Sequence, residues 1–133
     1  MIVLDASAAL ELLLGTPAGE RVAGRIASPD ETLHAPHLID LEVAQVLRRY
    51  EASRAMSPAR AREALDDFAD LEITRYPHEI LLSRIWDLRK NATAYEGAYL
   101  ALAEALGAPL LTADGRLAST PGHGARVEVV RQH

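Results

Sequence analysis

The stretch Ile2–Ser7 reads IVLDAS and decides the fold, because three strand-type apolar residues are followed by an acid and then by a hydroxyl. A second stretch far downstream, Leu110–Asp114, reads LLTAD and again places an acid and a hydroxyl two positions apart. Each apolar run predicts a short buried strand that ends beside an acid, Asp5 or Asp114. Ligands bind at the carboxyl ends of the strands in an open parallel sheet. Two such acids, joined by others from helices, could form an oxygen-only pocket for a hard divalent cation.

Between these stretches, strand-like and helix-like segments alternate, which indicates an α/β fold. N-cap and proline pairs at Thr16-Pro17 and Ser57-Pro58 predict helix starts, and Gly15 is a typical helix terminator. In chain order we expect strands at 2–4, 32–35, around 73, 109–112 and 127–130, and helices at 8–14, 17–26, from Pro36, from 58, after Pro77, and from Thr93 to before Gly107. We therefore predict a single domain over residues 1–133, a three-layer α/β/α sandwich around a mostly parallel sheet. The two helices between the second and third strands could instead project as a hairpin, with apolar stripes available to a partner chain.

Composition excludes several classes of protein. The 133 residues include no cysteine, which excludes disulfide frameworks, thiolate zinc sites and cysteine nucleophiles. The net charge of −5 argues against a high-affinity, non-specific nucleic-acid binder, although clustered acids in a nucleic-acid enzyme would also lower the charge. Asp5 and Glu11 interrupt the early apolar run, and no secretion signal is evident. We expect a cytoplasmic protein that does not enter a membrane.

Each candidate acid also has an ordinary structural role. Asp5 is equally well placed to cap the helix that follows it, and Asp114 lies in an ordinary turn sequence. Glu42 lies between apolar neighbours on a helix, so we expect it to be partly buried and to need a cation or hydrogen bonds. Glu96 completes a capping box with Thr93, and the local pattern favours that role over a metal role.

Aromatic residues and helix stripes give further expectations. Tyr95 and Tyr99, one helical turn apart beside the predicted acids, are the pair that we expect to contact a substrate. Trp86 is expected in the core or at its rim. On the helix after Pro36, helical spacing predicts an apolar stripe, made of Leu38, Leu41, Val46, Leu47 and Tyr50. The five histidines show no metal-ligand spacing, and no phosphate-binding glycine loop is present.

With these residues described, the chain resembles the PIN-domain family and, within it, the VapC-type ribonuclease toxins of bacterial toxin–antitoxin systems. The resemblance extends over essentially the whole chain, through the motifs at 2–7, 41–43, 93–103 and 111–117. It implies that the metal-binding and catalytic acids are Asp5, Glu42, Glu96 and Asp114, with Ser7 and Thr112 supporting them by hydrogen bonds.

The chain departs from the family pattern at two places. The family most often has aspartate where this chain has Glu96, and the extra methylene moves the carboxylate by ~1.5 Å, about one bond length. Since Mg²⁺ demands near-ideal octahedral geometry, this shift could alter metal affinity or turnover. The family also commonly carries a further acid just after the Asp114 position, where this chain has Arg116 and Leu117.

The resemblance implies a Mg²⁺-dependent endoribonuclease (with Mn²⁺ as a second candidate) that is the toxin of a toxin–antitoxin pair. The acids would hold cations that polarise the phosphodiester and activate water. It also implies a structured RNA substrate, a cognate antitoxin protein and a homodimer. A catalytically weak metal- or RNA-binding module that acts through protein partners is the main alternative, because a capping Glu96 would leave the site one ligand short. A phosphoacceptor domain, in which Asp5 or Asp114 would receive a phosphoryl group, ranks last. It lacks a lysine partner on a late strand, since the only lysine, Lys90, lies on a predicted helix.

Overall fold

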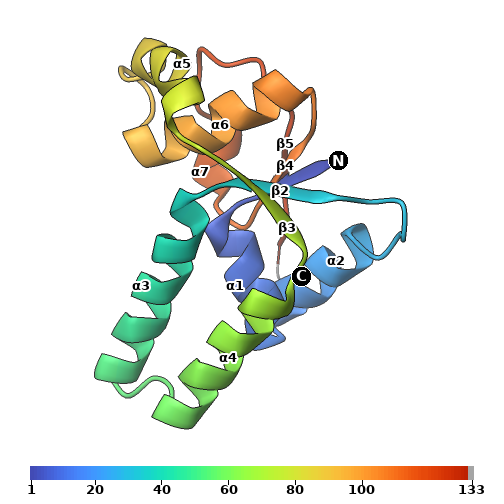
Figure 1. Ribbon diagram of the computed structural model, residues 1–133, viewed down its shortest axis with the longest axis vertical. Helices are drawn as coiled ribbons and strands as arrows, with labels where there is room; N and C mark the ends of the chain where they lie inside the picture. Colours follow the sequence, from blue (N-terminus) through green and yellow to red (C-terminus); the bar gives the residue numbers. More distant parts are fainter. Residues whose placement is uncertain (132–133) are drawn as a thin grey trace.

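The computed structural model describes residues 1–131, and its centre is a five-stranded parallel sheet (Figure 1). The strands lie side by side in the order β3-β2-β1-β4-β5. Their bounds are Ile2–Leu4 for β1, Leu33–Pro36 for β2, Ile73–Tyr76 for β3, Leu110–Thr112 for β4 and Val127–Val129 for β5. All neighbouring strands are parallel, as predicted.

The central position of β1 explains why its three residues are all apolar. β1 pairs with β2 on one side and with β4 on the other, so Val3 is in register with both His34 and Leu110. Ile2, Val3 and Leu4 are at most 1% exposed. The chain winds outward from β1 to β3 and then returns to β4 on the opposite side of β1. This reversal creates a switch point at the carboxyl ends of β1 and β4, where open α/β sheets bind their ligands.

Helices cover both faces of the sheet and connect the strands. Their bounds are Ala6–Leu14 for α1, Pro17–Arg25 for α2, Leu38–Ala52 for α3, Pro58–Asp70 for α4, Leu82–Asp87 for α5 (preceded by the 3₁₀ turn η1, Glu79–Leu81), Ala94–Leu106 for α6 and Gly115–Ala118 for α7. In Figure 1, α5 and α6 lie above the sheet, and α1 lies below it with α3 and α4. The three-layer α/β/α prediction is confirmed. Every helix within the described residues is too short or too polar to cross a bilayer.

Local end signals place several helices as predicted. Thr16 and Ser57 cap α2 and α4 by accepting hydrogen bonds from backbone N–H groups one turn ahead, and proline follows each of them. Gly15 and Gly107 end α1 and α6 with φ values of 66° and 63°. These are left-handed conformations that glycine adopts at low cost.

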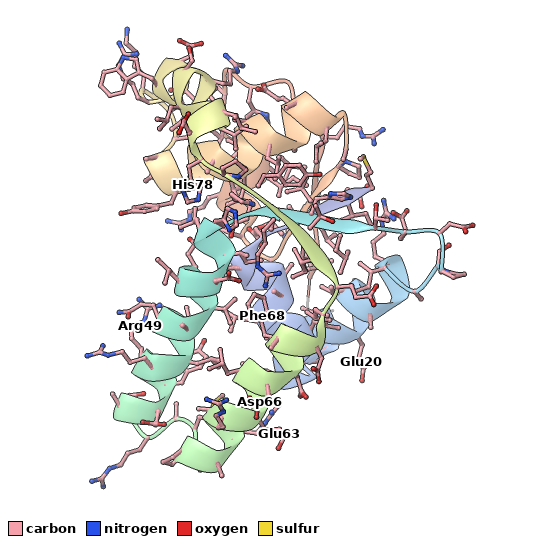
Figure 2. The ribbon with its side chains drawn as sticks, viewed as in Figure 1. Glu20, Arg49, Glu63, Asp66, Phe68 and His78 are labelled. Carbon is pink, nitrogen blue, oxygen red and sulfur yellow. The ribbon has the colours of Figure 1, made fainter. Side chains whose placement is uncertain are left out.

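The long pair α3 and α4 projects away from the sheet as a hairpin (Figure 1). Phe68 lies on the inner side of α4 and is 4% exposed, whereas Glu63 and Asp66 lie on its outer side (Figure 2). On α3, Val43 and Leu47 are buried. The projecting arrangement that we allowed for this pair is therefore the observed one, with its inner apolar residues already covered by α1 and by each other.

Three sequence-based expectations about this part of the fold and its neighbours are wrong in whole or in part, and one short helix was not predicted. Pro36 ends β2 instead of starting a helix, because the pairing of β2 with β1 stops at His34 and no ladder needs an N–H group from Pro36. The stripe predicted for α3 is right in part: Leu47 is buried and Leu38 and Val46 pack against the core, but Leu41 is 74% exposed, and the buried residues also include Ile39 and Val43. Trp86 is 66% exposed and does not lie in the core. The helix α7 was not predicted, because its four residues are too few to show a period.

The prediction of a single domain over 1–133 stays a prediction, and its last two residues lie outside the described part of the chain.

Candidate functional site

Asp5 is the most buried of the predicted acids, at 5% exposure, and it has both of the roles that its sequence position allowed. Its Oδ1 atom accepts the backbone N–H of Ala8 at 2.9 Å, which caps α1. The same oxygen accepts the Ser7 hydroxyl at 2.7 Å, and Oδ2 accepts the Thr112 hydroxyl at 2.5 Å. Burial raises the pKa of Asp5, and the hydrogen bond from Thr112 opposes that rise. The carboxyl group is thus held in one orientation by three donors.

Ser7 and Thr112 join the ends of β1 and β4. Their Oγ atoms lie 3.1 Å apart. The Ser7 oxygen also accepts the N–H of Ala113 at 2.9 Å, and the Thr112 oxygen accepts the N–H of Asp114 at 3.0 Å. The two hydroxyls therefore fix the position of Asp5 and also the backbone that carries Asp114.

Glu42 reaches the same region from the first turns of α3. It is half-buried, and its Oε1 atom accepts the Tyr99 hydroxyl at 2.6 Å. Burial raises the pKa of Glu42, while the hydrogen bond from Tyr99 lowers it and the charge of Asp5 raises it further. Tyr99 is 3% exposed, and burial together with the neighbouring Glu42 raises its pKa, so its phenol keeps its proton and stays a donor.

Glu96 forms the capping box that its sequence predicted. Its Oε1 atom accepts the N–H of Thr93 at 2.8 Å, and the Thr93 hydroxyl accepts the N–H of Glu96 at 3.1 Å. This contact ties one carboxylate oxygen to the start of α6. Glu96 nevertheless faces the same pocket as the other acids.

Asp114 caps α7 and forms an ion pair with Arg116. Its Oδ1 atom accepts the N–H of Arg116 at 3.0 Å, and the guanidinium donates from Nε to Oδ1 at 3.2 Å and from Nη2 to Oδ2 at 3.0 Å. The Arg116 guanidinium lowers the pKa of Asp114, so this carboxylate is charged at neutral pH.

One pocket of about 150 Å³ brings the four predicted acids together at the carboxyl edge of the sheet. Each acid comes from a different element, namely the end of β1, α3, α6 and the end of β4. Ser7, Tyr95 and Tyr99 also line this pocket, together with Ala6 and Leu117. Thr112 does not line it and supports it from below, through Asp5.

The donor set is the one that a hard divalent cation requires, since all four acids offer carboxylate oxygens. The side chains do not yet converge on one point: among residues 1–131, no three acids or histidines lie close enough to hold a metal ion. The hydrogen bonds described above account for this, because Tyr99, Thr93 and Arg116 each hold one carboxylate in place. The pocket therefore has the right ligands, but cation binding would require some of these contacts to rearrange.

Two features of the site were not predicted. The hydrogen bond from Tyr99 to Glu42 joins residues that are 57 positions apart in the sequence, and no local pattern signals it. Arg116 was noted only where the family commonly has an acid, although a basic residue two positions after Asp114 could have suggested an ion pair.

The model of the PIN domain family matches residues 2–122. The chain belongs to the PIN-domain family. As a PIN domain it is 45% identical over 130 residues to Ribonuclease VapC12 of Mycobacterium tuberculosis, covering 98% of this chain and 99% of that protein. It is 47% identical over 120 residues to VapC ribonuclease Mb0985 of Mycobacterium bovis, covering 90% and 91%. These relatives place the chain among the VapC ribonucleases.

Solved structures agree with this PIN fold. VapBC2 from Rickettsia felis, whose structure is described as bound to a DNA fragment from its promoter, superposes with a TM-score of 0.70 and 14% identity, covering 97% of this chain and 98% of that one. Mycobacterium tuberculosis VapC20, described as a Sarcin-Ricin loop cleaving toxin, gives a TM-score of 0.67 and 14% identity, with 93% and 97% covered. At these identities, the superpositions show the fold alone.

Proposed function

We propose that this PIN domain is an endoribonuclease that acts as the toxin of a toxin–antitoxin pair and depends on Mg²⁺ or Mn²⁺. The observation that carries the proposal is the single pocket lined by Asp5, Glu42, Glu96 and Asp114. The identity of 42–47% to several VapC ribonucleases supports the same activity. A bound cation would supply Lewis-acid polarisation of the phosphodiester and activation of water.

The residues at the pocket have different roles in the proposed reaction. Asp5, Glu96 and Asp114 would bind the cation directly, and Glu42 would bind it or orient the attacking water. Ser7 and Thr112 hold Asp5 in a fixed orientation through hydrogen bonds of 2.7 and 2.5 Å. Water attack needs no ribose 2′-hydroxyl, so cleavage would leave a 5′-phosphate and a 3′-hydroxyl.

Substrate and partners follow from the same proposal. The substrate would be a structured RNA, in keeping with the loop-cleaving activity named for VapC20. A cognate antitoxin is supported by the VapBC2 assembly among the structural neighbours. Several apolar side chains that are each more than half exposed support homodimer formation, among them Leu41, Ile80, Leu82, Trp86 and Tyr95. These functions belong to the cytoplasm, where we place the protein.

The alternative of a weak, non-catalytic module rests on Glu96 alone. The capping box is present, as that alternative requires. The relatives are ribonucleases, however, and they give the module no support. The Oε2 atom of Glu96 accepts no hydrogen bond from the described residues, so Glu96 can cap α6 and still present one oxygen to the pocket.

The test is cleavage of total bacterial RNA by the purified protein in Mg²⁺, in Mn²⁺ and in chelator. We expect discrete fragments with 5′-phosphate ends that disappear in chelator and fall by at least about a hundredfold in Asp5→Asn, as expected for loss of electrostatic stabilisation at a reacting centre. Asp66→Asn is the matched control, since Asp66 is an exposed aspartate on α4 that does not line the pocket. Equal cleavage by Asp5→Asn and the parent would overturn the proposed site.

The variant Glu96→Asp separates the enzyme from the module in the same assay. Similar activity in parent and variant is the result expected of an enzyme that uses glutamate. A large gain from an inert parent would instead show that Glu96 has disabled the site.

A further inference from the structure

Arg116 occupies an unusual position for a basic residue beside a cluster of acids. Its guanidinium donates to both oxygens of Asp114, from Nε at 3.2 Å and from Nη2 at 3.0 Å. The charge of Glu96 also acts on it. One positive charge is therefore paired with one of the four carboxylates that face the pocket and acts on a second at longer range.

This ion pair is not needed to form α7. The backbone N–H of Arg116 already donates to Oδ1 of Asp114 at 3.0 Å, and that contact alone caps the helix. Within residues 1–131, the hydrogen bonds of the Arg116 side chain all go to Asp114. The side chain is 86% exposed, so it makes no contribution to the core.

We propose that Arg116 is an internal counter-ion that competes with the divalent cation for Asp114. This inference rests on the proposed function, because it concerns the cation site assigned there. The guanidinium donates to both oxygens of Asp114 and thereby opposes rotation of that carboxylate toward Asp5 and Glu42. Cation binding requires the guanidinium to leave, and Arg116 thereby weakens the affinity of the site for the cation.

Exposure limits the strength of this competition. Ion pairs with one strongly exposed partner are weak and are screened by salt. Arg116 is therefore held firmly enough to lower cation affinity, yet loosely enough to be displaced at sufficient cation concentration. From such an exposed pair we expect an effect of roughly 1.5-fold to fivefold on the dissociation constant.

The test is Mn²⁺ binding to the whole chain by titration calorimetry at low ionic strength, with no RNA present. Arg116→Gln removes the charge and leaves a shorter polar side chain, and it should bind Mn²⁺ roughly 1.5-fold to fivefold more tightly than the parent. Arg116→Lys keeps the charge without the two-point contact and should fall between the two. The advantage of Arg116→Gln should shrink as salt is raised, because screening weakens the competing ion pair.

The matched control is Arg62→Gln. Arg62 is an exposed arginine on α4, with a side chain that is 73% exposed and paired with Asp66 at 3.0 Å, so its loss changes the net charge by the same amount away from the pocket. If Arg62→Gln tightens Mn²⁺ binding as much as Arg116→Gln does, the effect is one of net charge and the inference is wrong.

The remaining outcomes separate this inference from the proposed function. If the parent binds Mn²⁺ and Asp114→Asn binds it weakly, but Arg116→Gln binds no more tightly than the parent, Arg116 is not a competitor while the cation site stands. If Arg116→Gln leaves Mn²⁺ affinity unchanged and, in a separate binding assay with RNA, weakens RNA binding, Arg116 is a substrate contact and the inference is overturned. If neither the parent nor Arg116→Gln binds Mn²⁺, both the inference and the proposed cation site fail.

Discussion

Replacing Thr112 by valine removes the buried hydroxyl that connects the two strand ends at the pocket. Thr112 is fully buried, donates to Oδ2 of Asp5 at 2.5 Å and accepts the N–H of Asp114 at 3.0 Å. Valine has nearly the same shape but can form neither bond. Asp5 would keep its hydrogen bonds from Ser7 and from the N–H of Ala8, so only one of its three donors is lost.

The magnitude follows from which groups lose partners. A hydrogen bond to a charged group contributes about 1.5–3 kcal/mol, and a neutral one about 0.5–1.5 kcal/mol. The N–H of Asp114 lies in a half-buried residue where water can replace the lost acceptor, so its share is small. We therefore expect Thr112→Val to lower the free energy of unfolding by about 2–3 kcal/mol where Asp5 is ionised.

The assay is urea unfolding at pH 7 with chelator present, so that no cation contributes. Thr74→Val is the matched control, because Thr74 is an exposed threonine on β3 of the same sheet, where the change should stay within about 0.5 kcal/mol. In an Asp5→Asn background, the hydroxyl of Thr112 bonds to a neutral amide, so the cost of Thr112→Val should fall to about 1 kcal/mol. An equal cost in both backgrounds would refute the reasoning, because the loss would then come from packing and not from the charge of Asp5.

Two further predictions concern the supports of the fold. Gly19→Ala should lower the free energy of unfolding by about 1–3 kcal/mol, because its Cβ would clash with the backbone of Glu11, 2.6 Å from the carbonyl carbon, where α2 packs on α1. Gly24→Ala on the same helix meets nothing within 4 Å and should be neutral or stabilising by about 0.5 kcal/mol; similar losses for both in urea titrations would contradict the packing argument. Glu104 accepts two hydrogen bonds from the guanidinium of Arg84, at 2.8 and 2.9 Å, and Arg84 lowers the pKa of Glu104. The stabilisation from this pair is therefore present above the unfolded-state pKa of glutamate, about 4.3, and is lost as the pH falls through the lower pKa of the folded state. The urea midpoint of Glu104→Gln should therefore lie below that of the parent at pH 7 and converge with it near pH ~3, whereas a constant difference at both values would show that the charge is not involved.

Local chemistry explains which parts of the fold the sequence predicted correctly. The caps at Thr16, Ser57 and Thr93 and the terminators at Gly15 and Gly107 depend on contacts within one helical turn, and all five are present. The meeting of Asp5 and Asp114 at one edge followed from a different rule, because the carboxyl ends of neighbouring parallel strands share an edge.

Contacts between distant elements explain the errors. Pro36 carries a helix-start signal, but its pairing with Tyr76 across the sheet keeps it in β2. The predicted buried face of α3 included Leu41 and left out Val43. Packing against α1, and not the periodicity of α3, decides that Val43 faces inward and Leu41 faces solvent. The side-chain pair of Tyr99 and Glu42 could not be predicted, since it depends on how α3 and α6 approach each other.

The sequence offered a helix cap as the alternative to a metal ligand for Asp5 and Glu96, and a turn as the alternative for Asp114, but these structural roles do not exclude the metal role. Asp5 caps α1, Glu96 completes the capping box of α6 and Asp114 caps α7, so the starts of these helices meet at the pocket. Backbone N–H groups and the positive ends of helix dipoles stabilise carboxylates at such positions. Four acids around a pocket of about 150 Å³ would repel one another strongly if they had no such partners. The capping contacts therefore explain how this fold holds its acids close together. The sequence pattern fits both a structural role and a metal role at these positions because the same residues have a structural role and line the pocket.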